Sequence, residues 1–373
     1  MYQLLDFNVD YLALQKAPVY LVGTGKEAVK AYKRIFIRAI QLGRMFRMAG
    51  VYTLDQEWFG KNYCSAFVRD LKAGKDPEGI YLVAENDYHK AKKMIDLLNE
   101  SGIGQIIVTL PTLQFPLKRE EFEKNRKLFF ENREKIQYVY ERVDDKSKKI
   151  WEKLLRARWD PESDQALLYR DALDLSMETG SRQYFPEGEI FKQPEKEGVF
   201  IDGGALSGSS AIGFARWCGK DYGKIYSFEP DTRYHDLLET NIRCHRMERV
   251  KIMDAALYDY TGVADFSAEP IGSSKVGQGE GKVPVVSIDD LFLTKRERVA
   301  YIKMDIEGSE CKALDGAKQI IQRDRPKLAI CIYHGEEDIF QVPYKIMSEL
   351  GYTRIHIRHY SDTVGESVVY AVR

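Results

Sequence analysis

The sequence has few cysteines, and their arrangement narrows the class of protein. The five cysteines are widely spaced and form no C-x-x-C pair, so we expect neither a disulfide framework nor a zinc site. This cysteine usage suits a reducing compartment and predicts a cytoplasmic protein. The N-terminal stretch has no basic region followed by an apolar one, so we expect no signal peptide.

Long apolar runs and an excess of one charge are also missing. No run approaches the roughly 20 apolar residues that span a bilayer, so no membrane span is predicted. Lys and Arg number 56 and Asp and Glu number 57, which gives a formal net charge of −1. Because nucleic-acid affinity rests mainly on neutralising phosphates, no nucleic-acid partner is predicted. The length of 373 residues and the 44% hydrophobic content instead fit a folded protein of two or three domains.

Residues 18–110 alternate short β-branched runs with charged amphipathic stretches. Helical patterns cover residues 26–50 and 87–102, and strand-like runs lie before, between and after them. Strands that alternate with helices indicate βαβ units and a parallel sheet. We therefore expect residues 1–117 to form a small Rossmann-like domain.

A glycine turn, Gly23-Thr24-Gly25, follows the first of these strands. Ala28 stands where a dinucleotide fingerprint has its third glycine, and Asp55 ends the next strand, where a carboxylate can hold a ribose. A strand–turn–helix junction that needs small residues and binds nothing explains the same pattern. Both interpretations stay open at this point.

Residues 118–190 have a different composition. The stretch 117–159 lacks Gly and Pro, is dense in Lys, Arg and Glu, and places aromatic and aliphatic residues at roughly helical spacing. The charges are typical of a solvated helix face. We expect a helical linker region here, between the first domain and a second one.

Residues 191–373 repeat the α/β alternation on a larger scale. The strand candidates are GVFID, KIYSFE, VKIMDAAL, VAYIKMD, KLAICIYH, TRIHIRH and SVVYAV. Helical patterns separate the first five, but only a short loop separates the last two, which indicates an antiparallel hairpin at one edge of the sheet. The predicted fold is α/β, with a mostly parallel sheet that ends in a hairpin, as in class I methyltransferases.

Ionisable residues end the first five strands of this second domain. They are Asp202, Glu229, Asp254, Asp305 and His334. Ligands of an open parallel sheet bind at the carboxyl ends of the strands. Because desolvating charges is costly unless something pairs with them, this row indicates a binding site rather than a purely structural sheet.

The spacing around the first strand indicates the ligand. Asp202-x-Gly204-x-x-x-Gly208 has the form typical of S-adenosylmethionine sites and differs from the G-x-G-x-x-G of dinucleotide enzymes. The glycines let the backbone approach the ligand, and the N-terminus of the next helix offers N–H groups to its carboxylate. We expect Asp202 to face the ammonium group of the ligand.

The next two strand ends fit the nucleoside of the same ligand. Glu229 lies 21 residues beyond Gly208, where a carboxylate can accept both ribose hydroxyls. Asp254 is expected to accept from the adenine amino group, and Ala255 leaves room for the ring. The predicted cofactor-binding residues are Asp202, Gly203, Gly204, Gly208, Ser209, Glu229, Pro230, Asp254 and Ala255.

These stretches resemble the FkbM family of S-adenosylmethionine-dependent methyltransferases. The matching segments include VFIDGGALSGSSAIGF, IYSFEPD, VPVVSIDDLF and VAYIKMDIEGSECKALDGAK. The most distinctive element is Lys303-Met304-Asp305-Ile306-Glu307-Gly308-Ser309-Glu310. The resemblance covers residues 118–373 and implies the fold, S-adenosyl-L-methionine as the cofactor, and O-methylation, often of sugar hydroxyls.

An alcohol loses a proton as it attacks a methyl group, so a general base is expected near the acceptor. Asp305 and His334 are the candidates because they end adjacent strands, and Glu307 is expected to orient the acceptor. The three residues also resemble an oxygen and nitrogen metal-ligand set. No second carboxylate cluster accompanies them, so no metal is predicted.

The leading hypothesis is thus an O-methyltransferase that acts on a small-molecule or glycan acceptor. One alternative is an NAD-dependent sugar oxidoreductase that uses the Gly23-Thr24-Gly25 turn. Another is a non-enzymatic nucleotide-binding scaffold. We expect residues 1–117 to position or recognise the acceptor, or to mediate assembly into a homo-oligomer.

Overall fold

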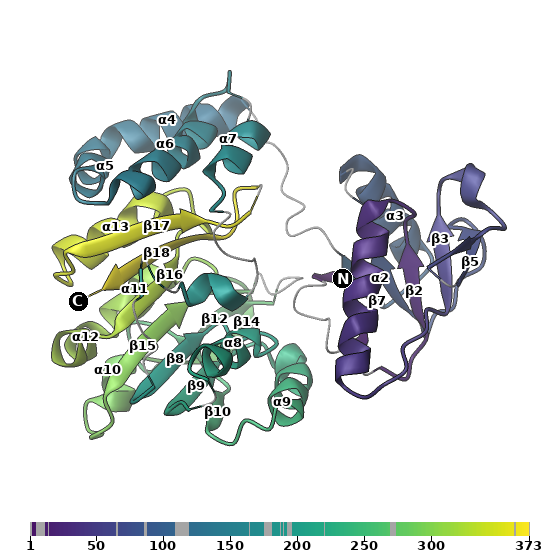
Figure 1. Cartoon of the computed structure of the whole chain (residues 1–373). Coiled ribbons are helices and arrows are strands. Elements are labelled where there is room, and N and C mark those ends of the chain that lie inside the picture. Colours follow the sequence, from purple (N-terminus) through teal and green to yellow (C-terminus); the bar gives the residue numbers. More distant parts are fainter. Residues whose placement is uncertain are drawn as a thin grey trace. The chain divides into compact units, whose positions relative to one another are not determined.

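The chain divides into two compact units, one of residues 1–113 and one of residues 114–268 and 274–373 (Figure 1). The computed structural model describes residues 2–372 apart from 5–11, 14, 65, 86–87, 109–118, 164, 175–180, 187, 189, 192–195, 220, 269–273 and 362. The domain boundary expected after residue 117 lies outside the described residues.

The first unit is built on a mostly parallel sheet with the strand order β1-β7-β6-β2-β3-β5-β4, in which only the β4–β5 pair is antiparallel. The strands are β1 (Tyr2–Leu4), β2 (Val19–Val22), β3 (Gly50–Thr53), β4 (Asn62–Tyr63), β5 (Ala66–Asp70), β6 (Ile80–Val83) and β7 (Gln105–Val108). The helices are α2 (Lys26–Gln41) and α3 (Tyr88–Glu100), and the 3-10 turn η1 covers Gln56–Trp58. The predicted Rossmann-like alternation is confirmed.

Burial explains why the central strands of this unit are continuous apolar runs. Every residue of β2, β3 and β6 is buried, as expected for parallel strands that are covered on both faces. Helix α2 ends at Gln41, whereas the pattern predicted a helix up to residue 50. Gly43 has a φ of +68°, a left-handed conformation that stops a helix.

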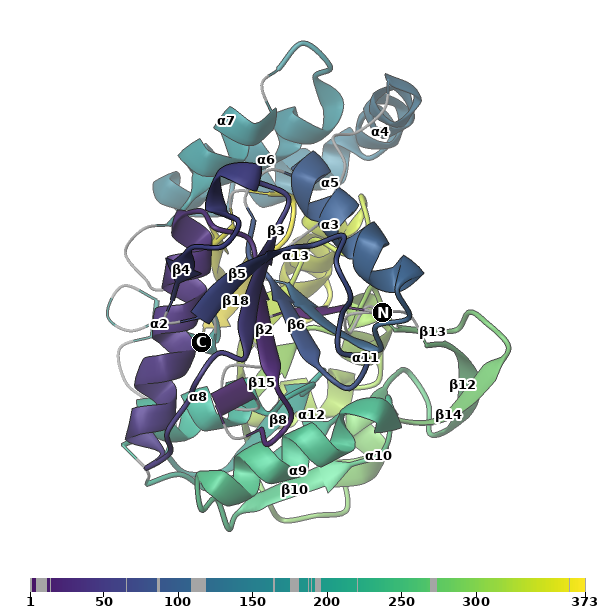
Figure 2. The ribbon, with the colours of Figure 1, turned by 90° about the vertical axis from the view of Figure 1, so that its right-hand side faces the viewer.

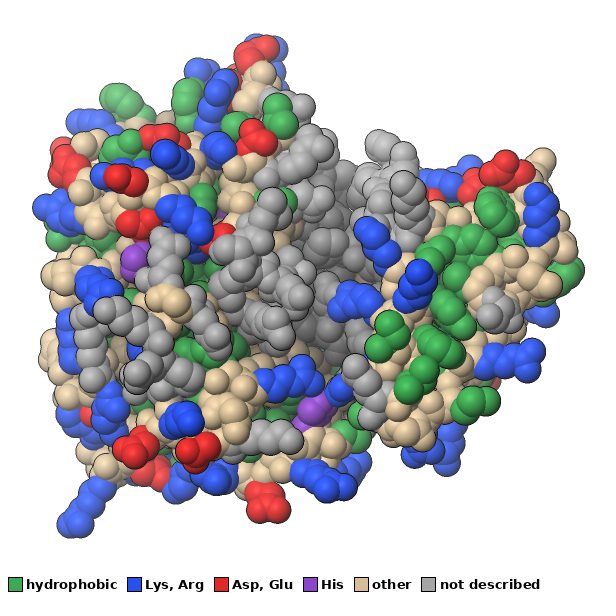
Figure 3. Space-filling view, viewed as in Figure 1, with side chains coloured by type: hydrophobic (Ala, Val, Ile, Leu, Met, Phe, Trp, Pro, Cys, Tyr) green, Lys and Arg blue, Asp and Glu red, His purple; other side chains and the backbone are tan. Residues whose placement is uncertain are grey.

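The outer face of α2 is both basic and apolar. Phe36, Ile37 and Ile40 expose 39%, 53% and 60% of their surface, and Met45 beyond the helix is fully exposed. Figure 3 shows green hydrophobic and blue basic side chains together on this part of the first unit. Helix α2 therefore carries apolar side chains on its exposed face as well as on its buried face.

The second unit contains a seven-stranded sheet with the order β10-β9-β8-β15-β16-β18-β17. The strands are β8 (Val199–Gly203), β9 (Lys224–Phe228), β10 (Val250–Met253), β15 (Val299–Met304), β16 (Lys327–Cys331), β17 (Arg354–His359) and β18 (Ser367–Val372). The first five strands in this order, from β10 through β9, β8 and β15 to β16, pair in parallel. Strand β18 pairs antiparallel with both β16 and β17. This confirms the predicted antiparallel hairpin at the sheet edge.

Two hydrophobic cores cover the two faces of this sheet. Ile201 and Ile302 belong to one core, and their neighbours Phe200 and Tyr301 belong to the other, because successive side chains of a strand point to opposite faces. The helices that follow the strands are α8 (Ser209–Trp217), α9 (His235–Cys244), α10 (Ile288–Phe292), α11 (Glu310–Asp315), α12 (Lys318–Asp324) and α13 (Asp338–Ser348).

Four further helices pack on the second unit, where the sequence suggested a linker between domains. They are α4 (Arg119–Glu131), α5 (Arg133–Tyr140), α6 (Asp145–Trp159) and α7 (Gln165–Ala172), and Figure 1 shows them beside α13 and β17. Trp151 is fully buried and its indole N–H donates to the carbonyl of Ile339 at 3.0 Å. The apolar face of α6 therefore belongs to the same core as the sheet.

A small second sheet was not predicted. It has the order β11-β14-β12-β13, with β11 (Ala256–Leu257), β12 (Gly262–Ser267), β13 (Lys275–Val276) and β14 (Gly281–Val286), and β12 to β14 project from the second unit in Figure 2. The predicted strand 250–257 is thus wrong, because β10 ends at Met253 and β11 joins the small sheet. The alternation of buried and exposed residues along β12 and β14 is the signal that could have revealed it.

Among the described residues, no helix combines the length and the apolar character that crossing a membrane requires.

Candidate active site

The site lies at the carboxyl ends of β8, β9, β10, β15 and β16, which are neighbours in one parallel sheet. The register places Asp202 beside Lys303 and Gly203 beside Met304, so the glycine turn and the segment after β15 lie next to each other. The strand-end residues predicted from the sequence are thereby brought to one edge.

The glycine turn after β8 depends on the absence of side chains. Gly204 has a φ of +72°, and a Cβ atom there would lie 1.8 Å from the carbonyl oxygen of Asp305. Gly208 is left-handed too, with a φ of +78°, and is the N-cap of α8 without a side-chain cap bond. The first N–H groups of α8, which begins at the half-buried Ser209, are thus left to a ligand or to water.

Asp202 lies inside the protein and not at the surface of the turn. Its carboxylate is fully buried, accepts from Ser210 Oγ at 2.7 Å, and lies 3.4 Å from Lys303 Nζ. Lys303 also donates to the carbonyl oxygens of Gly203 and Gly204, at 2.9 and 2.7 Å. The expected contact of Asp202 with a ligand ammonium therefore does not fit this geometry, because the buried carboxylate already contacts Ser210 and Lys303.

Glu229 has the position that the sequence predicted, directly after β9 and before the half-buried Pro230. Its two carboxylate oxygens accept from the backbone N–H groups of Leu206 and Asp231, at 2.8 and 2.9 Å. Burial raises the pKa of Glu229 to about 7, although these hydrogen bonds oppose the shift. Each oxygen keeps a further lone pair, so the carboxylate can accept two more hydroxyl groups.

The third strand end is more open. Asp254 exposes 70% of its side chain and lies 3.4 Å from His235 Nδ1, whereas Ala255 is buried. Within the glycine turn, Ser207 Oγ is buried and has no hydrogen-bond partner among the described residues. An orphaned hydroxyl, an uncapped helix and a buried carboxylate along one turn fit a polar ligand such as S-adenosylmethionine.

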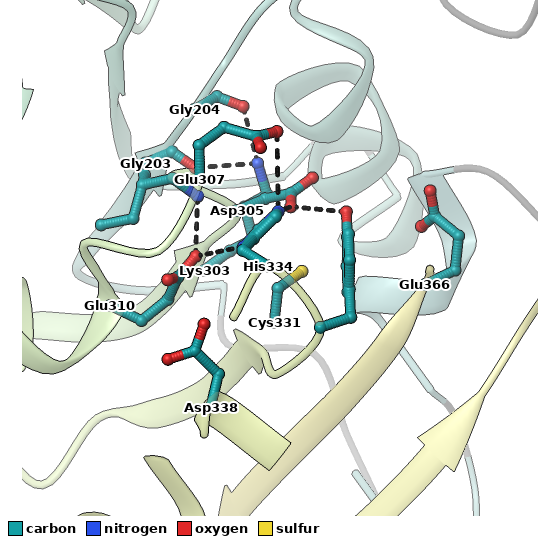
Figure 4. A network of polar contacts seen from close by, with 12 residues as sticks. Gly203, Gly204, Lys303, Asp305, Glu307, Glu310, Cys331, His334, Asp338 and Glu366 are labelled. Atoms are coloured by element: carbon teal, nitrogen blue, oxygen red, sulfur yellow. Dashed lines mark hydrogen bonds and ion pairs between the residues drawn. The ribbon is translucent and has the colours of Figure 1, made fainter. Parts of the chain in front are cut away.

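A second group of charged residues surrounds His334, which follows β16. Figure 4 shows its imidazole among the carboxylates of Asp305, Glu307 and Glu310. Nδ1 lies 2.9 Å from Glu310 Oε1, and Nε2 lies 3.2 Å from Asp305 Oδ1 and 3.6 Å from Glu307 Oε1. The structure thus brings together all three residues predicted to be catalytic.

The Asp305 carboxylate is held by two tyrosines as well. The hydroxyl groups of Tyr184 and Tyr333 donate to its two oxygens, at 2.8 and 2.9 Å. Burial acts to raise the pKa of Asp305, but His334 and Lys303 outweigh it and hold the pKa well below its usual range. Asp305 is therefore ionised but weakly basic.

The ionisation of the other two residues changes the expected roles. Burial alone would lower the pKa of His334, but Glu307 and Glu310 outweigh it and raise the pKa well above its ordinary value. A histidine with a raised pKa keeps its second proton to higher pH, and a protonated imidazole has no lone pair to take another. For Glu307, burial raises the pKa to about 7, partly opposed by His334, so this carboxylate is the best placed to exchange a proton at neutral pH.

The backbone at Glu307 is also unusual. Its φ is +56°, a left-handed conformation that is costly for a residue with a side chain. Its side chain keeps 24% exposure, against 4% for His334 and none for Glu310. Asp305 exposes 20% of its side chain, so Glu307 and Asp305 are the two open carboxylates of the group, and Glu307 is slightly the more exposed.

Sequence reasoning did not predict the contacts that four further residues make in this site. Lys303 and Glu310 belong to the motif that carries the family resemblance, but from the sequence alone Glu310 is explained as a favourable acidic residue in the first turn of α11. The contacts of Tyr184 and Tyr333 with Asp305 arise only from the fold. In the part of the chain that the structure describes, no three His, Cys, Asp or Glu side chains are arranged to hold a metal ion.

The glycine turn of the first unit is less suited to a nucleotide. Asp55 Oδ2, the expected ribose acceptor, already accepts from Lys90 at 2.7 Å, Thr24 at 3.2 Å and Thr53 at 3.3 Å. Gly23 has a φ of +117°, and a Cβ atom there would lie 2.5 Å from the carbonyl oxygen of Ala84. Gly23 is thus explained by packing, whereas a Cβ atom at Gly25 would meet no atom within 4 Å among the described residues.

The match to a known protein family lies in the second unit. Residues 202–354 match the model of the methyltransferase FkbM domain. The chain is similar in fold to the crystal structure of methyltransferase FkbM from Methylobacillus flagellatus KT, with a TM-score of 0.55 and 19% identity over 98% of this chain and 93% of that one. No curated protein matches the sequence.

Two further solved structures match about half of this chain. One is Aeropyrum pernix fibrillarin in complex with S-adenosyl-L-methionine, with a TM-score of 0.33 and 16% identity over 49% of this chain and 70% of that one. The other is a SAM-dependent O-methyltransferase from Thermotoga maritima, with a TM-score of 0.32 and 13% identity over 48% of this chain and 60% of that one.

Proposed function

Since the second unit carries a methyltransferase FkbM domain, we propose that it uses S-adenosylmethionine to methylate a hydroxyl group of a sugar or glycan acceptor. The observation that carries this proposal is the adjacency of two sites on one sheet edge. The glycine turn with Glu229 lies beside β15, and Asp305, Glu307 and His334 follow β15 and β16.

The cofactor side is assigned from the turn after β8. We infer that Glu229 accepts the two ribose hydroxyls and that the uncapped N-terminus of α8 receives the carboxylate of the ligand. Ser207 Oγ is available to a polar group of the same ligand. When bound, S-adenosylmethionine would supply a methyl group that is already activated by the sulfonium.

The acceptor side is assigned to the segment after β15. Glu307 takes the proton of the acceptor hydroxyl as the new oxygen–carbon bond forms and the sulfur–carbon bond breaks, because its pKa of about 7 lies near the working pH. Asp305 stays ionised and, with the imidazolium of His334, holds Glu307 and the acceptor in place. Sequence reasoning had assigned the base to Asp305 or His334 and only the orientation of the acceptor to Glu307.

Ligand-binding calorimetry on the full chain tests the assignment. S-adenosylmethionine and S-adenosylhomocysteine are expected to bind, while NAD and a nucleotide sugar serve as probes for the glycine turn of the first unit. Transfer of a labelled methyl group to a panel of mono- and oligosaccharides then tests the acceptor class. Binding of NAD alone would overturn the proposal and favour the oxidoreductase alternative, and binding without any transfer would favour a scaffold.

The first prediction concerns Glu229. Glu229→Ala leaves the ribose hydroxyls and two backbone N–H groups without their acceptor, so we expect affinity for S-adenosylhomocysteine to fall by about 1–3 kcal/mol, or roughly 5- to 150-fold. The exposed Glu239 on α9 provides a matched control as Glu239→Ala. Calorimetry at one pH measures both, and unchanged affinity in Glu229→Ala would remove this residue from the site.

A further inference from the structure

Tyr184 lies outside the segment that matches the methyltransferase domain, yet it reaches the acceptor side of the site. It ends the 3-10 turn η2 (Ser181–Tyr184) and is 7% exposed. Its hydroxyl group donates to Asp305 Oδ2 at 2.8 Å. A residue ahead of the domain thus contacts a residue that follows β15.

The backbone of η2 is fixed to the sheet by other tyrosines. The hydroxyl group of Tyr301 on β15 donates to the carbonyl oxygen of Tyr184, and that of Tyr370 on β18 donates to the carbonyl oxygen of Gln183. The side chain of Gln183 also donates to Glu366, which precedes β18. Tyr184 is therefore held independently of Asp305, as a positioning group must be.

The two oxygens of Asp305 have different tyrosine donors. Tyr184 binds Oδ2 and Tyr333 binds Oδ1, which also faces His334 Nε2 at 3.2 Å. Two donors on opposite oxygens fix the rotation of a carboxylate, which a single donor does not. The ring of Tyr184 also lies 5.0 Å from Lys303 Nζ, the ammonium group that holds the glycine turn.

We propose that Tyr184 is a positioning residue that sets the direction of the Asp305 carboxylate and, through it, of His334 and Glu307. The proposal rests on the proposed function, because its kinetic effect requires methyl transfer at this site. It also means that the segment ahead of the methyltransferase domain supplies part of the acceptor site.

Tyr184→Phe tests this role because it removes the hydroxyl group and keeps the buried ring. We expect kcat to fall about 10- to 100-fold, since small displacements of a reacting group have effects of that size, while affinity for S-adenosylhomocysteine stays within about twofold. Tyr352→Phe is the matched control, because Tyr352 is also buried and donates to the carbonyl oxygen of Pro326 away from the site. An unchanged kcat in Tyr184→Phe would overturn the proposal.

A double-variant comparison separates positioning from general stability. If Tyr184 acts through Asp305, Tyr184→Phe should change kcat by less than about twofold in an Asp305→Asn background. A loss of the same size in both backgrounds would contradict the proposal.

A spectroscopic measurement keeps the test independent of the proposed function. The chain has six histidines, so selective isotope labelling makes the imidazole resonances of His334 assignable by a His334→Gln variant. Tyr184→Phe is expected to shift them and Tyr352→Phe is not. Absence of methyl transfer in the wild-type chain would overturn the proposed function, and an unshifted His334 resonance would overturn the role of Tyr184.

Discussion

Glu307→Gln is expected to lower kcat by about 10²- to 10⁴-fold, the usual cost of losing a general base. Glutamine keeps the size of the side chain and its place in the left-handed turn, but it cannot accept the proton of an alcohol. Cofactor affinity should stay within about twofold, because Glu229 and the glycine turn are unchanged. Single-turnover methyl transfer at saturating S-adenosylmethionine measures the effect.

The same assignment fixes the pH dependence of the reaction. A base must be deprotonated, so kcat should rise with pH through about 7 and level off above it. The charges that face Glu307 are His334 and Lys275, which lower its pKa, and Asp305 and Glu310, which raise it. The cofactor must be saturating, because burial also raises the pKa of Glu229 to about 7. Cofactor affinity would otherwise change with pH over the same range as kcat.

Two further variants test whether Glu307 is the group that sets this pH dependence. Burial raises the pKa of Asp338 to about 7 as well. If Glu307 is the base, the fall of kcat below about pH 7 should persist in Asp338→Asn. Glu337→Gln is a control from the exposed residue directly before α13. If Glu307→Gln kept the wild-type rate while Asp305→Asn lost it, the base would be Asp305 and our assignment would be wrong.

Sequence patterns predicted the parts of this fold that local periodicity and spacing determine. Six of the seven strand candidates of the second domain correspond to strands of the main sheet, whereas the candidate 250–257 is divided between β10 and the small sheet. The short loop before β18 correctly indicated the antiparallel hairpin. Because the carboxyl ends of parallel strands share one edge, the row from Asp202 to His334 also predicted which residues come together.

What the sequence could not supply depends on burial and on long-range contacts. We propose a different role for Asp202 because its buried carboxylate pairs with the ammonium group of Lys303 on the neighbouring strand. We propose a different role for His334 because Glu310 and Glu307 surround it and raise its pKa. Tyr184 reaches Asp305 across more than a hundred residues of sequence, a contact that no local pattern encodes.

The second large effect is expected from Lys303→Met. Lys303 is 2% exposed and is the ammonium partner of the fully buried Asp202. Burial favours the neutral amine, but Asp202 and Asp305 outweigh it and raise the pKa of Lys303. Methionine fills a similar volume but, among the described residues, leaves the Asp202 carboxylate with the hydroxyl groups of Ser210 and Ser227 as its donors, at 2.7 and 3.3 Å.

Removing one partner of a buried ion pair costs about 3–5 kcal/mol, because the remaining charge stays desolvated. For a unit of this size that corresponds to a fall in Tm of roughly 6–20 °C. Tryptophan fluorescence reports mainly on the second unit, since only Trp58 of the four tryptophans lies in the first. The exposed Lys251→Met on β10 is the matched control and should leave Tm nearly unchanged.

The double variant Asp202→Asn with Lys303→Met distinguishes the charge from the packing. Without Asp202 no ionised group is left unpaired, so the double variant should recover a substantial part of the stability that Lys303→Met loses. Cofactor affinity should not recover with it, because the carbonyl oxygens of Gly203 and Gly204 still lack the ammonium group that holds the turn. Equal losses of stability in the single and double variants would mean that the pair is not the cause, and full recovery of binding would mean that Lys303 does not shape the turn.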